Sequence, residues 1–112
     1  MKNKLIAACF TLASANTIAG AYTGTIKAIV CHEAAISSVC QISVNGTPPG
    51  LPCASSSWRY TMDGTTTEGR NMLSILLAAQ VSRQQITIGG KGACTLSGAS
   101  EDIRHVYINT PE

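Results

Sequence analysis

Hydrophobic and polar residues alternate along three segments in the first half of the chain. In residues 23–32, Ile26, Ala28 and Val30 alternate with Thr25 and Lys27. A period of two with many β-branched residues is typical of a β-strand. The same pattern predicts a second strand over residues 38–44 and a third over residues 56–62.

After Asp63 and Gly64, the spacing of apolar residues changes to three and four, which predicts a helix. Thr65 and Glu68 fit a capping box, with Thr65 as N-cap and Glu68 at the third helical position. The helix is expected to end near residue 82 or 83. Its apolar side is wider than one core contact requires and comprises Met72, Leu73, Ile75, Leu76, Leu77 and Ala79, with Gln80 beside them.

The remaining segments return to strand patterns. Residues 84–88 predict a strand, residues 89–92 a glycine-rich bend, residues 93–96 a continuation of the sheet, and residues 103–108 the last strand. Three strands, one helix and two or three further strands indicate a mainly β domain. The expected fold is a five- to six-stranded antiparallel OB-fold barrel, with the helix between the third and fourth strands.

The first residues have the pattern of an export signal. Lys2 and Lys4 precede an apolar stretch over residues 5–13, and Ala19-Gly20-Ala21 fits the small-residue rule for cleavage. Residues 1–21 are therefore predicted to be a cleaved signal peptide, and residues 22–112 one OB-fold domain. This predicts a secreted or periplasmic bacterial protein. No stretch reaches the roughly 20 apolar residues of a membrane span, so no membrane insertion is expected.

Cleavage changes the charge of the protein. The whole chain has a formal net charge of +2, with 8 basic and 6 acidic residues. Lys2 and Lys4 would leave with the signal peptide, which makes the mature domain neutral. Binding to a nucleic-acid backbone requires a positive field, so no nucleic-acid partner is expected.

Four cysteines, Cys31, Cys40, Cys53 and Cys94, remain after Cys9 is removed. An even number in a short exported chain predicts two disulfides, for which three connectivities exist. The preferred pairs are Cys31–Cys40, which would join neighbouring strands, and Cys53–Cys94, which would enclose the helix. Pairing of Cys40 with Cys53 across the turn at residues 45–48 remains an alternative.

The sequence favours neither catalysis nor a metal site. His32 and His105 are isolated, and with the cysteines they match no zinc-ligand spacing. No serine lies in a nucleophile elbow, and no pair of carboxylates is placed by a motif. We therefore expect a protein that is not an enzyme and that uses neither a metal nor another cofactor.

Three segments resemble the B subunit of subtilase cytotoxin and related small exported bacterial proteins. They are residues 53–58 (CASSSW), 65–79 (TTTEGRNMLSILLAA) and 86–94 (ITIGGKGAC). The shared motifs are a cysteine before the helix, a Leu-Leu-x-Ala at the end of the helix, and a Gly-x-Gly-x-Cys after the next strand. In that family the two flanking cysteines pair, which supports the pair Cys53–Cys94.

The resemblance implies a non-catalytic binding subunit that forms a homopentameric ring, recognises host-cell glycans and accompanies a catalytic A subunit. The broad apolar side of the helix is consistent with a ring in which helices of neighbouring copies meet. The glycan-binding segment that precedes the first strand in toxin members is missing here, so no contact residue is carried over. The alternative is a stand-alone secreted or periplasmic OB-fold accessory domain that binds another protein.

The residues themselves suggest one candidate glycan site, because aromatic rings stack on sugars and charged groups bond sugar hydroxyls or carboxylates. Packing of Trp58 or Tyr60 beneath the helix is the alternative role for these aromatic residues. The candidate glycan-binding residues are Trp58, Arg59, Tyr60 and Asp63.

Overall fold

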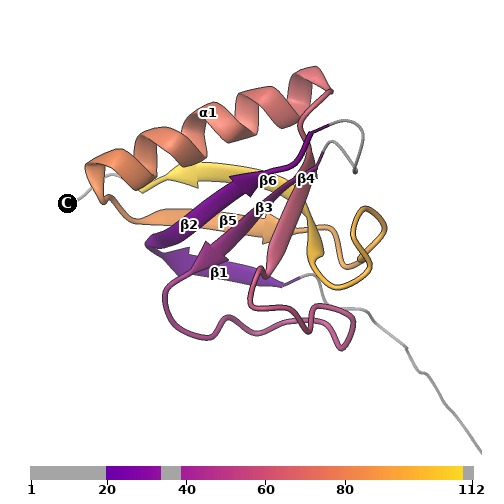
Figure 1. The fold of residues 1–112 in the computed structure, drawn as a ribbon. Helices are drawn as coiled ribbons and strands as arrows, with labels where there is room; N and C mark the ends of the chain where they lie inside the picture. The colour runs from indigo at the N-terminus through magenta and orange to yellow at the C-terminus, as the bar shows by residue number, and fades with distance from the viewer. Residues whose placement is uncertain (1–19, 34–38, 110–112) are drawn as a thin grey trace, which may run out of the picture.

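The computed structural model describes residues 20–33 and 39–109. These residues confirm the predicted fold class, a mainly β OB-fold barrel with one helix between strands (Figure 1). The elements are β1 (Ala21–Gly24), β2 (Ile26–Cys31), β3 (Val39–Val44), β4 (Tyr60–Asp63), α1 (Thr67–Ser82), β5 (Ile86–Gly90) and β6 (Glu101–Ile108).

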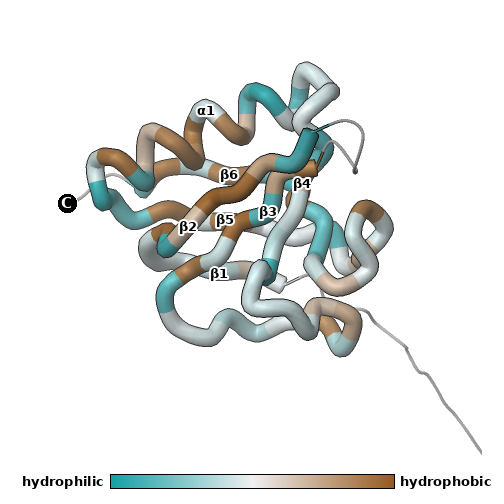
Figure 2. The backbone as a smooth tube through the Cα atoms, viewed as in Figure 1, coloured by the Kyte–Doolittle hydropathy of each residue, from teal (hydrophilic) through white to brown (hydrophobic). Residues whose placement is uncertain are grey.

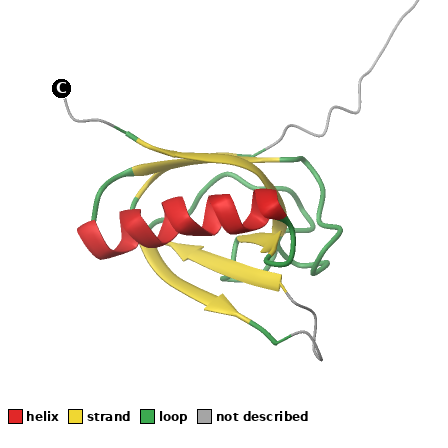
Figure 3. Cartoon of the chain, turned by 90° about the horizontal axis from the view of Figure 1, so that it is seen from above, coloured by secondary structure: helices red, strands yellow, loops and turns green. Residues whose placement is uncertain are grey.

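The six strands form one curled sheet in the order β1-β5-β6-β4-β3-β2. All neighbours are antiparallel except β4 and β6, which run parallel. The two outermost strands, β1 and β2, are consecutive in the chain and only Thr25 separates them. The backbone therefore bends at Thr25 from one edge of the sheet to the other and closes the barrel (Figures 1 and 3). The prediction of one continuous strand over residues 23–32 is wrong at this bend.

Helix α1 lies across the barrel and contributes Leu76 and Ala79 to its core. Figure 2 shows hydrophobic stretches in α1, β2 and β5, the elements that surround this core. Fully buried residues from separate strands, among them Ile42, Tyr60 and Ile88, pack in the same cluster. The remaining apolar residues of the helix are more exposed, with Leu77 at 44% and Val81 at 84% of full exposure.

The helix begins one residue later than the sequence predicts. Thr66, not Thr65, is the N-cap, and its Oγ1 accepts a hydrogen bond from the backbone N–H of Gly69 at 2.9 Å. Thr65 instead donates two hydrogen bonds to Oδ1 of Asp63, from its backbone N–H at 2.8 Å and from its hydroxyl at 2.6 Å. The predicted end near residue 83 is correct, because Arg83 adopts the left-handed conformation (φ 59°) that terminates the helix.

Three strand predictions also need correction. Strand β4 starts only at Tyr60, so residues 56–59 are irregular. Residues 89 and 90, predicted to bend, continue β5, because Gly90 pairs with Ile103 across a bulge. Residues 93–96 are not a strand, because Asp102 accepts the backbone N–H groups of Thr95 and Leu96 and removes them from any ladder.

Both preferred disulfides are confirmed, which excludes the pair Cys40–Cys53. Cys31 and Cys40 are direct partners across β2 and β3, with Cα atoms 4.0 Å apart. Cys53 and Cys94 lie in loops before and after α1, with Cα atoms 6.2 Å apart. Disulfides of this kind persist in oxidising environments, so the domain belongs outside the reducing cytoplasm.

Residues 1–19 of the predicted signal peptide lie outside the described residues. The last two residues assigned to it are part of the folded domain, because Ala21 pairs with Gly89 and Gly20 accepts a backbone hydrogen bond from Gly90 at 2.8 Å. Within residues 20–33 and 39–109, the single helix is too short and too polar to cross a membrane.

Candidate functional site

Of the four residues predicted to bind a glycan, Tyr60 lies in the core. Its side chain is 1% exposed, and its hydroxyl has no hydrogen-bond partner among the described residues. Burial, and secondarily the charge of Glu101, raise its pKa to about 12. The ring packs inside the barrel and therefore presents no face to a sugar, which matches the structural role considered for it from the sequence.

The other three residues make hydrogen bonds to neighbouring residues in the chain. Arg59 donates from Nη1 to the carbonyl oxygen of Ala54 at 2.5 Å, which holds the loop before β4. Trp58 is half-buried, and its backbone N–H donates to Ser56 Oγ at 3.0 Å. The hydrogen bonds from Thr65 lower the pKa of Asp63. Trp58 and Arg59 thus belong to the loop before β4, whereas Asp63 ends β4 and bonds Thr65 in the turn before α1.

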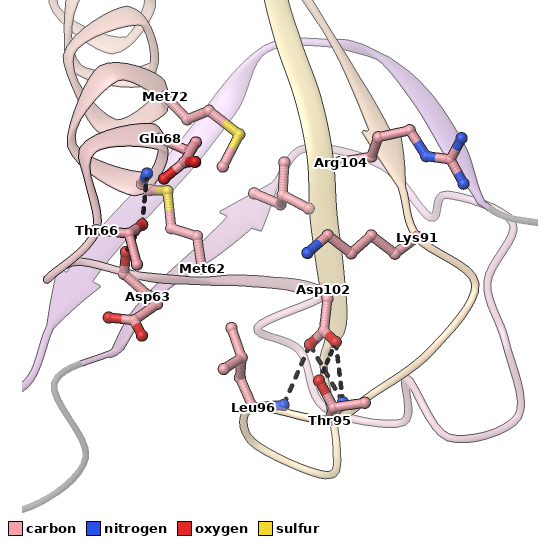
Figure 4. A pocket seen from close by; sticks show the side chains of 12 residues that line it. Met62, Asp63, Thr66, Glu68, Met72, Lys91, Thr95, Leu96, Asp102 and Arg104 are labelled. Carbon is pink, nitrogen blue, oxygen red and sulfur yellow. Dashed lines mark hydrogen bonds between the residues drawn. The ribbon is translucent and has the colours of Figure 1, made fainter.

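Asp63 lines a pocket of about 510 Å³ between the first turn of α1 and the segment that follows β5 (Figure 4). Asp63, Glu68 and Asp102 are the acidic residues that line it, and Met62 and Met72 form part of its apolar wall. Figure 4 shows the ammonium group of Lys91 directed toward the middle of the pocket, while the guanidinium of Arg104 turns away from it.

Asp102 is the most strongly bound of these carboxylates. It is 3% exposed and accepts hydrogen bonds from the N–H groups of Thr95 and Leu96 and from the Thr95 hydroxyl. These bonds fold the loop that carries Cys94. The role of Asp102 is therefore structural, and its lone pairs are not free for a ligand.

A second surface, which sequence reasoning missed, lies on the outer side of β5 and β6. His105 and Tyr107 stack with ring centroids 6.1 Å apart, and Tyr107 is 51% exposed. Together with Gly20 and Ala21 they line a shallow depression of about 320 Å³. We call this surface the β5–β6 patch, defined by Thr87, Gly89, Gly90, Arg104, His105 and Tyr107.

The bulge in β6 explains how the patch forms. Gly89 pairs with His105 and Gly90 pairs with Ile103, so Arg104 is the additional residue on one side of the ladder. An extra residue in one strand shifts the alternation of inward and outward side chains along that strand. As a result, Arg104 and His105 are both exposed, although they are adjacent in sequence.

Gly89 is necessary for the position of His105. A Cβ at residue 89 would lie 2.5 Å from Nε2 of His105, so the imidazole occupies the space that a side chain would fill. Beside it, Thr87 exchanges hydrogen bonds with Thr23 at 3.0 Å and Asn109 at 3.1 Å. The patch thus combines an aromatic face, a guanidinium and hydroxyl groups on paired strands.

The two histidines lie in different surroundings. The Nε2 of His32 shares a hydrogen bond with Oε1 of Gln41 at 3.2 Å, whereas His105 stacks on Tyr107. No group of three or more histidine, cysteine, aspartate or glutamate side chains among the described residues is arranged to hold a metal ion.

Comparison with known proteins found no matching family model, no similar curated protein and no similar solved structure.

Proposed function

We propose that the protein is a non-catalytic, exported binding module that recognises glycans, and that the β5–β6 patch is its sugar-binding surface. The observation that carries this proposal is the half-exposed Tyr107 ring, stacked on His105 and bordered by Arg104. Sugar rings stack on aromatic faces, and a guanidinium bonds hydroxyl or carboxylate groups. Such an arrangement fits an acidic or highly hydroxylated saccharide.

A glycan array with the disulfide-bonded protein tests the recognition of sugars. The matched variants are Tyr107→Ala, which removes the exposed ring of the patch, and Trp58→Ala, which removes the ring of the sequence-predicted site. We expect Tyr107→Ala to weaken glycan retention by about tenfold and Trp58→Ala to leave it unchanged. The reverse result would move the site to the loop before β4, and an array without binding would reject the glycan role.

We further propose that copies of the chain assemble as a homopentameric ring, as the resemblance to toxin B subunits implies, and that a catalytic A subunit accompanies it. The exposed Leu77 and Val81 on α1 support assembly, because exposed apolar side chains on one helix face favour contact with another surface. Light scattering of the wild type should give the mass of a pentamer, and Val81→Glu should reduce it. Asn71→Glu, on the polar part of the helix, serves as the control.

The same helix face favours one alternative function, a stand-alone accessory domain that binds a different protein. Leu77 and Val81 would then contact that partner rather than a second copy. A monomer at micromolar concentration in the light-scattering experiment would support this alternative and reject the ring.

A further inference from the structure

Glu101 is a buried carboxylate whose partners come from segments far apart in the chain. Its side chain is 1% exposed, and Oε2 accepts hydrogen bonds from the backbone N–H groups of Gly20 and Gly92, each at 2.9 Å. Burial of a carboxylate is unfavourable unless hydrogen bonds and a positive charge compensate for lost hydration. The two amide donors supply hydrogen bonds to Glu101 but no full charge.

Gly20 lies in close contact with the Glu101 carboxylate. A Cβ at residue 20 would lie 2.5 Å from Oε1 of Glu101 and 3.0 Å from the carbonyl oxygen of Pro49. The carbonyl of Gly20 also accepts the N–H of Gly90 at 2.8 Å and so extends the ladder between β1 and β5. Gly20 is therefore part of the folded barrel, and a side chain in its place would displace the Glu101 carboxylate.

We propose that the mature protein begins at Gly20 and that its terminal ammonium group forms a buried ion pair with Glu101. Thr17 and Ala19 supply the small residues that a leader peptidase requires before the cleaved bond. Water adds across the Ala19–Gly20 peptide bond, the Ala19 carbonyl becomes a carboxylate, and the freed Gly20 nitrogen takes up protons to become an ammonium group. One amide donor at Glu101 is thereby exchanged for a cation at the same position.

Cleavage after Ala21, which the Ala-x-Ala spacing favours, has two structural costs. It removes the Gly20 N–H from Glu101, and it removes the carbonyl that accepts the N–H of the buried Gly90. Both groups would lose a partner in a buried position. Cleavage after Ala19 retains both hydrogen bonds and adds an opposite charge at Glu101.

The first test is the mass of the exported protein, with the full chain produced in a bacterium that processes leaders. We expect the intact mass of residues 20–112 with two disulfides. A chain that starts at Tyr22 or at any other residue, or that keeps its leader, overturns the proposal. This result does not depend on glycan binding.

The second test is the reactivity of the amino terminus of the same exported protein toward an amine-acylating reagent. The terminal amine should react much more slowly in the folded protein than after unfolding in denaturant, whereas the exposed side chains of Lys27 and Lys91 should react at similar rates in both states. Equal reaction rates of the terminus in the folded and unfolded protein would reject the ion pair. Glu101→Gln should increase the reactivity of the terminus, while Glu68→Gln on the exposed face of α1 should not. If Glu101→Gln does not fold, the wild-type comparison still decides the question.

Discussion

The hydroxyl of Tyr22 lies 2.6 Å from the carbonyl oxygen of Asn45 and 3.0 Å from that of Thr25, and donates to both. Tyr22 belongs to β1, whereas Asn45 begins the turn after β3. This single side chain therefore joins the first strand, the bend at Thr25 and the end of β3. It holds together the place where the barrel closes.

Replacement of Tyr22 by phenylalanine should destabilise the domain by about 1 kcal/mol, because the ring stays in the core while the carbonyl oxygens of Thr25 and Asn45 lose their donor. Urea denaturation at neutral pH measures this loss. Tyr107→Phe is the matched control, since the hydroxyl of that exposed tyrosine makes no such contact among the described residues. Equal stability of the two variants would contradict the role of the Tyr22 hydroxyl.

Tyr60→Phe should behave differently, because the Tyr60 hydroxyl is buried without a partner among the described residues. At neutral pH we expect a change within about 1 kcal/mol, since no hydrogen bond is lost. The stabilities of Tyr60→Phe and the wild type should differ at alkaline pH. In the folded protein the pKa of Tyr60 is about 12, above its ordinary value of 10.0.

The folded state thus keeps a proton that the unfolded state releases between pH 10 and pH 12. Stability that is fully present below pH 10 is lost as the pH rises through this interval. Tyr60→Phe removes this contribution, so its unfolding midpoint in an alkaline titration should shift to higher pH.

Gly69→Ala tests the close contact at the start of α1. In an ordinary helix interior this change stabilises a protein by about 0.5–1 kcal/mol. Here the added Cβ would overlap the carbonyl oxygen of Asp63, which belongs to the backbone of β4. We expect destabilisation by about 1–3 kcal/mol in thermal or urea unfolding. Asn71→Ala, on the exposed face of the same helix, should be neutral or slightly stabilising.

The two disulfides should differ in their contributions to stability. Removal of Cys53–Cys94, which spans 41 residues, should cost about 4 kcal/mol, and removal of Cys31–Cys40, which spans 9, about 2.5 kcal/mol. Double cysteine-to-alanine variants, compared by urea denaturation, measure both values. Equal losses would contradict the entropic account, in which the longer loop restricts the unfolded chain more.

Local patterns in the sequence predict most of the fold. The alternation around Ile42 predicts a strand, and the apolar spacing around Leu76 predicts a helix. Both patterns arise because one side of each element faces the core, and both predictions agree with the structure. The capping prediction is wrong by one residue, because Asp63 and Thr65 both carry groups suited to this turn and only tertiary geometry decides which of them pair.

The candidate site was less predictable, for a physical reason. Trp58 and Tyr60 are conspicuous in the sequence, yet Tyr60 fills the core. Tyr107 and Arg104 share a surface only because the bulge in β6 turns Arg104 outward, and the bulge depends on pairing with Gly89 and Gly90. Pairing between strands that are distant along the chain leaves no periodic signal in either strand alone. The alternation of residues 103–108 therefore predicts a regular strand.

The closure of the barrel at Thr25 also affects how fast the chain folds. Strand β1 cannot pair until β5 has formed, and the contact of Thr23 with Thr87 spans 64 residues. Domains dominated by such distant pairings fold slowly, because the long loop must close before the contacts form. A chain with this topology is therefore expected to remain unfolded for longer after synthesis than a chain whose contacts are mainly local.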